Sequence, residues 1–176
     1  MRRRAGPGRG PHARARRGEA HRGSLPDIQA ALQWHLDRGE TSAGCQLANA
    51  LVTFWLGTNR IPDGDAWFSR LLAPPGEADA TRALALHQQG YLVFWGGEHD
   101  RAAERFRESL DLAASLDDAS LQALALAGLA RVALYSDASE AVRLLRKALE
   151  GSGSRSATAH VSRTATNWPL TPGWPP

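Results

Sequence analysis

The chain has 176 residues, of which 43% are hydrophobic and 22% charged, and its formal net charge at pH 7 is +3. Cys45 is its only cysteine, which excludes an intrachain disulfide and gives no sign of an oxidising compartment. The apolar runs are too short and too interrupted to span a bilayer, so we expect a cytoplasmic protein with no membrane partner.

The charge is distributed unevenly along the chain. Residues 1–23 hold eight arginines and one glutamate and have a net charge of +7, whereas residues 24–150 have a net charge of −6 and residues 151–176 of +2. We therefore expect three parts: a disordered Arg-rich arm (1–23), a helical domain (24–150) and a disordered tail rich in Gly, Ser and Pro (151–176). The acidic charge of the middle part makes nucleic acid an unlikely partner for the helices.

The two tails leave alternatives open. The arm lacks the apolar segment of a secretory signal, and its glycines and prolines disfavour a mitochondrial presequence. Nucleic-acid binding through the arm is the alternative function of the protein; we favour an arm without a partner, because Arg clusters in such segments need none to exist. In the C-terminal tail, Trp168 and Trp174 beside prolines suggest a docking peptide, and here too we favour a tail without a partner.

Local signals predict three helices in the first part of the domain. The S-x-x-D pattern from Ser24 predicts a helix start, and Gly39 predicts its end. A second helix is expected near residues 42–58. A short third helix is expected to begin near Pro62 and to stop before Pro74-Pro75-Gly76.

Residues 83–116 predict a helical hairpin whose helices are joined by Gly96-Gly97, with Asp100 capping the second helix. Gly90 leaves room for a neighbouring helix to approach. The next helix, opened by Asp117-Asp118, is apolar nearly all round, and we expect it to be the most buried element. A capping-box pattern from Asp137 then starts a last helix, whose inward residues are expected to be Ala141, Leu145, Ala148 and Leu149.

The hairpins recur at a fixed spacing. Trp55, Trp95 and Tyr135 end three successive first helices at intervals of 40 residues, and Leu72, Leu110 and Leu149 end the second helices at intervals of 38 and 39. Such a period predicts an α-solenoid, in which each helix pair buries its apolar face on the next pair. We expect the three aromatic residues to pack the turn inside each hairpin, and the tryptophans at positions 34, 55, 67 and 95 to be mainly core residues.

Catalytic signatures are missing from the sequence. It contains no phosphate-binding glycine loop, no H-E-x-x-H, no C-x-x-C and no G-x-S-x-G pattern. A pair formed by Cys45 and one of His35, His87 and His99 stays open on sequence grounds, although Cys45 lies on an apolar helix face and reads as a small hydrophobe. We therefore predict that the protein is not an enzyme and has no catalytic, cofactor-binding or metal-binding residues.

The spacing of Gly90, Ala102 and Phe106 resembles the tetratricopeptide repeat, although Val93 stands where that pattern has an aromatic residue and Ala114 where it has a proline. Residues 25–150, with phrases such as AALQWHLDRG, FWLG and EHDRAAERFRESLDLAASLDD, resemble the tetratricopeptide-type region of large actinobacterial regulators, the LuxR-family and related signal-transduction ATPases. The resemblance implies a fragment of such a regulator, because neither the phosphate loop of the ATPase nor the helix-turn-helix is present. The ATP binding and DNA binding of such regulators are therefore not assigned to any residue of this chain.

The predicted fold is an all-α, right-handed superhelix of about seven helices. The resemblance implies an interaction or effector-sensing module of a transcriptional regulator, with a protein, a peptide or a small effector as its partner. In tetratricopeptide folds the first helix of each pair lines the concave side. The resemblance therefore implies a groove lined by Leu51, His87, Tyr91 and Phe94, with Arg82 and Gln88 at its rim.

Overall fold

The structure is a computed structural model and describes residues 12–151. Within these residues it contains seven α-helices, which confirms the all-α prediction. In chain order the helices are α1 (His12–Asp37), α2 (Thr41–Gly57), α3 (Ile61–Leu72), α4 (Ala80–Trp95), α5 (His99–Ser115), α6 (Ala119–Ala133) and α7 (Ala138–Gly151).

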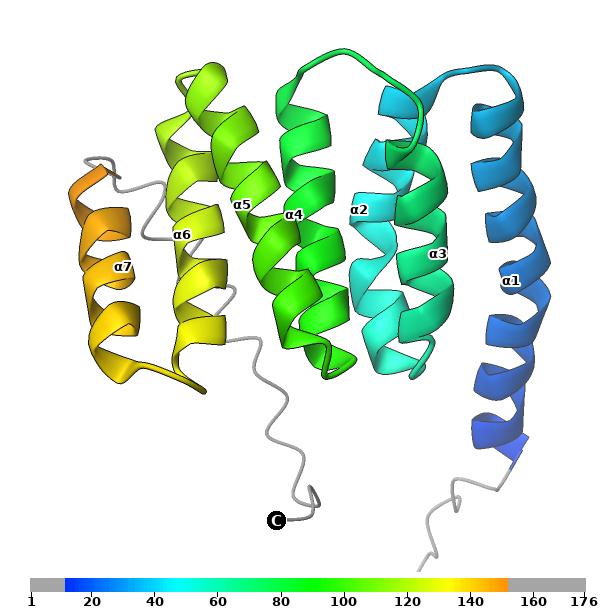
Figure 1. Cartoon of the computed structure of the whole chain (residues 1–176). Coiled ribbons are helices and arrows are strands. Elements are labelled where there is room, and N and C mark those ends of the chain that lie inside the picture. The colour runs from blue at the N-terminus through cyan, green and yellow to red at the C-terminus, as the bar shows by residue number, and fades with distance from the viewer. Residues whose placement is uncertain (1–11, 152–176) are drawn as a thin grey trace, which may run out of the picture.

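The helices stand side by side in a row with α1 at one end and α7 at the other, and α3 is drawn between α1 and α2 (Figure 1). Each helix packs on its neighbours in sequence, and α4 also packs on α2 and α6. Because the connections are short, consecutive helices run in opposite directions (Figure 1). The row therefore consists of α1 followed by the three predicted hairpins α2/α3, α4/α5 and α6/α7.

Turn residues end the helices where the sequence predicts. Gly39 follows α1 with a φ of +70°, and Gly97 follows α4 with a φ of +86°, a backbone conformation that residues with a side chain adopt only at a cost. Pro62 lies in the first turn of α3. Local chemistry alone is sufficient to set these boundaries.

Aspartate side chains cap three of the helices. Asp79 accepts a hydrogen bond from the backbone N–H of Arg82, and Asp118 and Asp137 each accept two from the first turn of α6 and α7. The predicted cap at Asp100 is wrong: Glu98 precedes α5, and Asp100 lies within its first turn. An acidic side chain is still favourable there, because the helix dipole is positive at that end.

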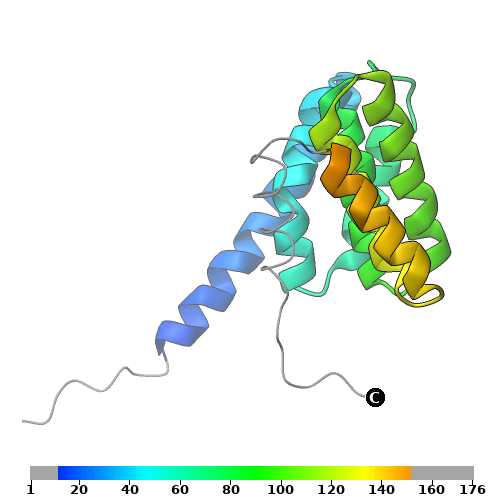
Figure 2. The ribbon, with the colours of Figure 1, turned by 90° about the vertical axis from the view of Figure 1, so that its left-hand side faces the viewer.

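The predicted helix start at Ser24 is also wrong, because α1 begins at His12 and carries Ser24 and Pro26 inside it. The Ala, Arg and Glu residues of the preceding segment favour a helix, and this preference outweighs the local start signal. Residues 1–23 were expected to form a disordered arm, but the backbone is helical from residue 12 onward. Its first eleven residues, and the tail after residue 151, lie outside the described residues. The first turns of α1 extend beyond the other helices (Figure 2).

The most buried helix is α4, not α6 as predicted. Ten residues of α4 are buried, against seven of α6. The physical reason is position: α4 lies in the middle of the row and packs on α2, α3, α5 and α6, whereas α6 is next to the last described helix. An apolar sequence shows that a helix can be buried, but its neighbours decide how much of it is.

Two glycines on different helices face the ring of Phe106, which is completely buried. A Cβ atom added to Gly90 would lie 2.9 Å from this ring, and one added to Gly128 would lie 2.6 Å from it. The predicted close approach at Gly90 is therefore confirmed. The ring of Phe106, which α5 supplies, lies between α4 and α6 and joins the second hairpin to the third.

The three aromatic residues spaced by 40 differ in burial. Trp55 is 1% exposed and packs edge-on against Phe68 at 5.8 Å, Trp95 is half-buried, and Tyr135 is 68% exposed. The expectation of a common core role is thus correct for Trp55 and wrong for Tyr135. Trp34 is likewise exposed, with the Arg38 guanidinium 4.7 Å from its ring.

Candidate functional site

Of the four residues predicted to line a groove, Leu51 is half-buried and the other three are buried. His87 is 3% exposed and contacts the ring of Phe106 at a centroid distance of 5.1 Å, while Tyr91 and Phe94 are 9% and 4% exposed. These side chains lie where α4 meets α5 and α6, because α6 packs on the side of α4 that the prediction left open. They belong to the packed interior of the row and do not line an open groove.

The two residues predicted at the rim of the groove lie at the surface of α4. Arg82 donates hydrogen bonds to the backbone oxygens of Leu72, at 2.6 Å, and Pro74, at 3.3 Å. Its guanidinium thereby holds the connection between α3 and α4 in place. Gln88 is half-buried.

A cation lies among aromatic rings between α4 and α6. The guanidinium carbon of Arg131 is 5.0 Å from the ring centroid of Tyr91 and 5.8 Å from that of Phe94. Phe94 also stacks on His99 at 5.1 Å and meets Tyr135 edge-on at 5.8 Å. Burial lowers the pKa of Arg131, but the attraction of the rings for a cation offsets part of that cost. The sequence analysis did not identify this cluster, because its members, such as Tyr91 and Arg131, lie 40 positions apart in the chain.

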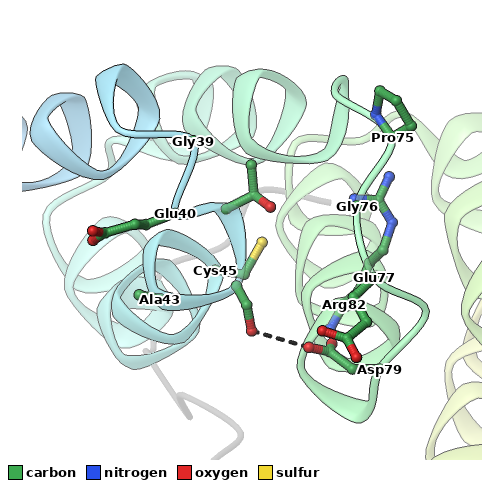
Figure 3. Close-up of a pocket in the computed structure, with 11 residues that line it drawn as sticks. Gly39, Glu40, Ala43, Cys45, Pro75, Gly76, Glu77, Asp79 and Arg82 are labelled. Carbon is green, nitrogen blue, oxygen red and sulfur yellow. Dashed lines mark hydrogen bonds between the residues drawn. The ribbon is translucent and has the colours of Figure 1, made fainter.

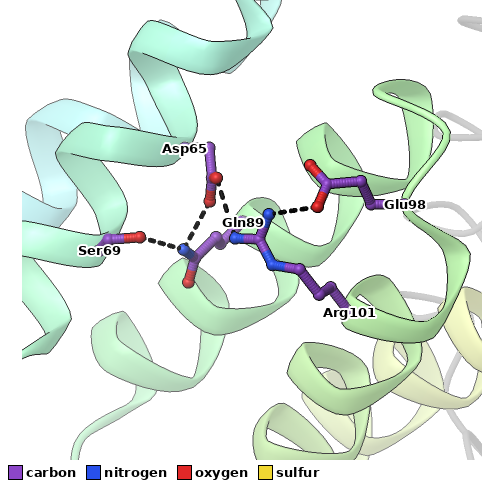
Figure 4. Close-up of polar contacts among 5 residues, drawn as sticks. All are labelled: Asp65, Ser69, Gln89, Glu98 and Arg101. Atoms are coloured by element: carbon purple, nitrogen blue, oxygen red, sulfur yellow. Dashed lines mark hydrogen bonds and ion pairs between the residues drawn. The ribbon is translucent and has the colours of Figure 1, made fainter.

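A second polar cluster ties α3, α4 and α5 together (Figure 4). The side-chain amide of Gln89, which is 1% exposed, donates to Asp65 and Ser69, both at 2.8 Å. Arg101 donates to the same Asp65 at 3.0 Å and to Glu98 at 2.6 Å, and these partners raise its pKa. The Oε1 atom of Gln89 has no hydrogen-bond partner among the described residues, but the bonds that its amide nitrogen and Arg101 make fix the relative position of the three helices, so this cluster has a structural role.

A pocket of about 400 Å³ lies between the α1–α2 turn and the α3–α4 connection (Figure 3). Ser42 donates to Asp79 across it at 3.0 Å. The charged residues of its lining are Glu40, Glu77, Asp79 and Arg82. Three carboxylates against one guanidinium give the pocket an acidic character.

Cys45 also lines this pocket, yet it is only 2% exposed. Burial raises the pKa of its thiol to about 11, and the charged groups that act on it are Arg82 and Asp79, not a histidine. His35 instead contacts Glu40 at 3.1 Å, and His99 stacks on Phe94. Because the thiolate is the nucleophilic form, the burial and raised pKa of Cys45 agree with its expected role as a small hydrophobe.

We expect Cys45 to react slowly with a disulfide reagent such as DTNB in the folded protein at neutral pH. The raised pKa alone reduces the thiolate fraction by about a hundredfold relative to an ordinary cysteine, and burial slows the reaction further. Stopped-flow absorbance with and without denaturant measures the difference. Equal rates in the two conditions would contradict the burial of this thiol.

The largest exposed apolar side chains of the third hairpin lie at the end of the row. Leu134 and Tyr135 follow α6 and are 61% and 68% exposed, and Val142 and Leu145 of α7 are 56% and 39% exposed. We call Leu134, Val142 and Leu145 the C-terminal apolar face; the ring of Tyr135 instead lies against Phe94 and His99 of the second hairpin. In the described part of the chain, α7 is the last helix of the row (Figure 1).

The prediction that Leu145 and Leu149 point inward is wrong, because these side chains are 39% and 60% exposed. Ala141 and Ala148 are buried as expected, and Leu144 packs beside Ala148 in place of Leu145. The sequence contains a signal for this outcome: α7 has more apolar positions than one side of a helix can bury.

Two further classes of site have no support in the described residues. No helix there is long and apolar enough to cross a membrane. The side chains described do not gather three or more potential metal ligands in one place.

Comparison with known proteins does not identify a family. No protein-family model matches the chain, and no curated protein matches it. The classification that the structure supports is therefore an all-helical domain, with seven helices among residues 12–151, each packed on its neighbours in sequence.

Proposed function

We propose that this protein is a binding module, a tetratricopeptide-like right-handed superhelix that recognises another protein through the C-terminal apolar face. The observation that carries the proposal is the exposure of Leu134, Val142 and Leu145 at one end of the row. Large apolar side chains gathered on a surface commonly mark a protein–protein contact, because covering them is favourable by about 25 cal/mol per Å².

The rest of the described surface favours binding over catalysis. The pocket beside Cys45 offers a protonated thiol and carboxylates, and its one arginine is bound to backbone oxygens. The predicted groove residues His87, Tyr91 and Phe94 are packed against α5 and α6, so a ligand would reach them only after a neighbouring helix moved. The C-terminal apolar face needs no such rearrangement.

The resemblance to the helical regions of LuxR-family regulators suggests the kind of process that the module serves. In such a regulator, a helical module transmits the presence of a partner or effector to the domains that bind ATP or DNA. Our proposal therefore includes a role in transcriptional regulation, with a partner that either carries such a domain or controls one.

The proposed function predicts that a charge placed in the C-terminal apolar face abolishes partner binding without unfolding the protein. Three immobilised baits are compared on extracts of the native host: the wild-type chain, Leu145→Glu and Ser139→Glu. The control Ser139 is exposed in the first turn of α7, where an acidic residue suits the helix dipole. We expect a protein that the wild type and Ser139→Glu retain and Leu145→Glu does not.

The retained protein is then purified and titrated calorimetrically against the three chains. Since 1.4 kcal/mol corresponds to a factor of ten in affinity, loss of one buried leucine should weaken binding by about tenfold or more. A partner that binds Leu145→Glu as tightly as the wild type would contradict the proposal. The proposal would also be contradicted if all three chains showed the same helical circular dichroism and no protein bound the wild type in preference to Leu145→Glu.

A further inference from the structure

The repeat itself indicates what kind of partner fits the C-terminal apolar face. Leu134 lies 40 residues after Phe94, and Leu145 lies 39 residues after Phe106, the same spacings that relate the hairpins. Phe94 and Phe106 are 4% and 0% exposed. The exposed leucines of the third hairpin thus occupy the positions that the second hairpin buries.

One helix, α6, covers both positions in the second hairpin, together with Tyr135 in the turn after it. Gly128 of α6 lies against the ring of Phe106, and Arg131 of α6 lies over Phe94, whose edge Tyr135 also contacts. Because a single helix reaches both phenylalanines, a single helix can reach both equivalent leucines. The internal packing of α6 on α4 and α5 is therefore a template for the missing contact at α7.

The template also specifies the residues of the docking helix. Gly128 is small because any Cβ would lie 2.6 Å from the Phe106 ring. Arg131 follows it by three residues, which places both on one side of α6, and Tyr135 lies in the turn after α6. A helix that docks at α7 needs a small residue opposite Leu145, a long side chain three residues later, and an aromatic ring in the turn after the helix, to cover Leu134.

The charges beside the face favour an acidic partner over a second copy of this chain. Arg143, Arg146 and Lys147 of α7 are exposed, while its acidic residues are Glu140, which pairs with Arg143, and Glu150, so the helix has a net charge of +1. Two copies meeting through α7 would bring like net charges together, whereas an acidic helix would not. The α6 helix of a second copy is already covered by its own α5 and α7.

We propose that the C-terminal apolar face docks an amphipathic helix of a partner protein. That helix has glycine or alanine opposite Leu145, a long side chain three residues later, an aromatic ring in the turn that follows it, and acidic residues along its rim. The inference rests on the proposed function and adds to it the chemical identity of the partner.

The test uses the full chain and a synthetic peptide that copies residues 118–137, labelled with a fluorophore and extended by a solubilising tail of glutamates. Fluorescence anisotropy measures its binding to the wild type, Leu145→Glu and Ser139→Glu. A matched peptide carries Gly128→Leu, and another replaces the glutamate tail by lysines. Each peptide tests one part of the proposal.

We expect the unchanged peptide to bind the wild type and Ser139→Glu equally, and Leu145→Glu at least about tenfold more weakly. The Gly128→Leu peptide should lose a similar factor, because its side chain meets Leu145. The lysine tail should weaken binding at low salt, and this difference should shrink as salt is added.

Binding that Leu145→Glu leaves unchanged would show that the peptide replaces the chain's own α6 on α5, and would overturn the proposal. A wild-type dimer in sedimentation equilibrium that Leu145→Glu dissociates would overturn it in favour of a second copy. If the peptide fails to bind while the bait comparison still yields a partner specific for Leu145, the docking helix is wrong and the proposed function stands. If neither experiment distinguishes Leu145→Glu, both are wrong.

Discussion

Replacing Trp55 by alanine should lower the free energy of unfolding by about 3 to 5 kcal/mol, as for other large-to-small changes of buried aromatic residues. Trp55 is 1% exposed, and its ring contacts Phe68 and lies beside Gly64. Tyr135→Ala, at the corresponding position of the third hairpin, should cost less than about 1 kcal/mol, because most of that side chain is exposed. Urea unfolding followed by far-UV circular dichroism measures both.

Trp95→Ala provides an internal control for this comparison. Trp95 is half-buried and contacts Tyr91 and Phe94 edge-on, so its replacement should have an intermediate cost. The order of the three losses should follow burial, not position in the repeat. Equal losses at positions 55 and 135 would show that Tyr135 is packed as the repeat alone predicts.

The second large effect concerns the contact between Phe106 and the glycines that face it. Phe106→Ala should cost about 3 to 5 kcal/mol, because it removes the ring that lies between α4 and α6. Gly128→Ala should also destabilise the protein: the gain of about 1 kcal/mol in helix propensity is smaller than the cost of about 1 to 3 kcal/mol for forcing a methyl group against the ring.

The two changes should be strongly coupled. In the Phe106→Ala background the ring is gone, so Gly128→Ala should become neutral or stabilising, and the double-mutant cycle should give an interaction energy of about 1 to 3 kcal/mol. Gly57→Ala is the matched control, because an added Cβ there meets nothing within 4 Å. An additive cycle would mean that Gly128 and Phe106 do not pack in solution as the structure has them.

The sequence by itself determined the local structure of the hairpins. Residues such as Asp118, Asp137 and Gly97 act within one helical turn or one tight turn, so their effect needs no information about distant parts of the chain. The spacing of 40 residues likewise revealed three helix pairs before any contact was known. Local signals failed at Ser24, where the helix propensity of the preceding residues extends α1 to His12.

Only the tertiary structure decided which side of each helix is covered. Periodicity groups His87, Tyr91 and Phe94 on α4, but α5 covers His87 and α6, far along the chain, covers Tyr91 and Phe94. The same pattern on α7 leaves Leu145 exposed, because no described helix lies beyond it. A repeat gives equivalent residues equivalent positions, whereas burial depends on whether a neighbouring helix is there to remove them from water.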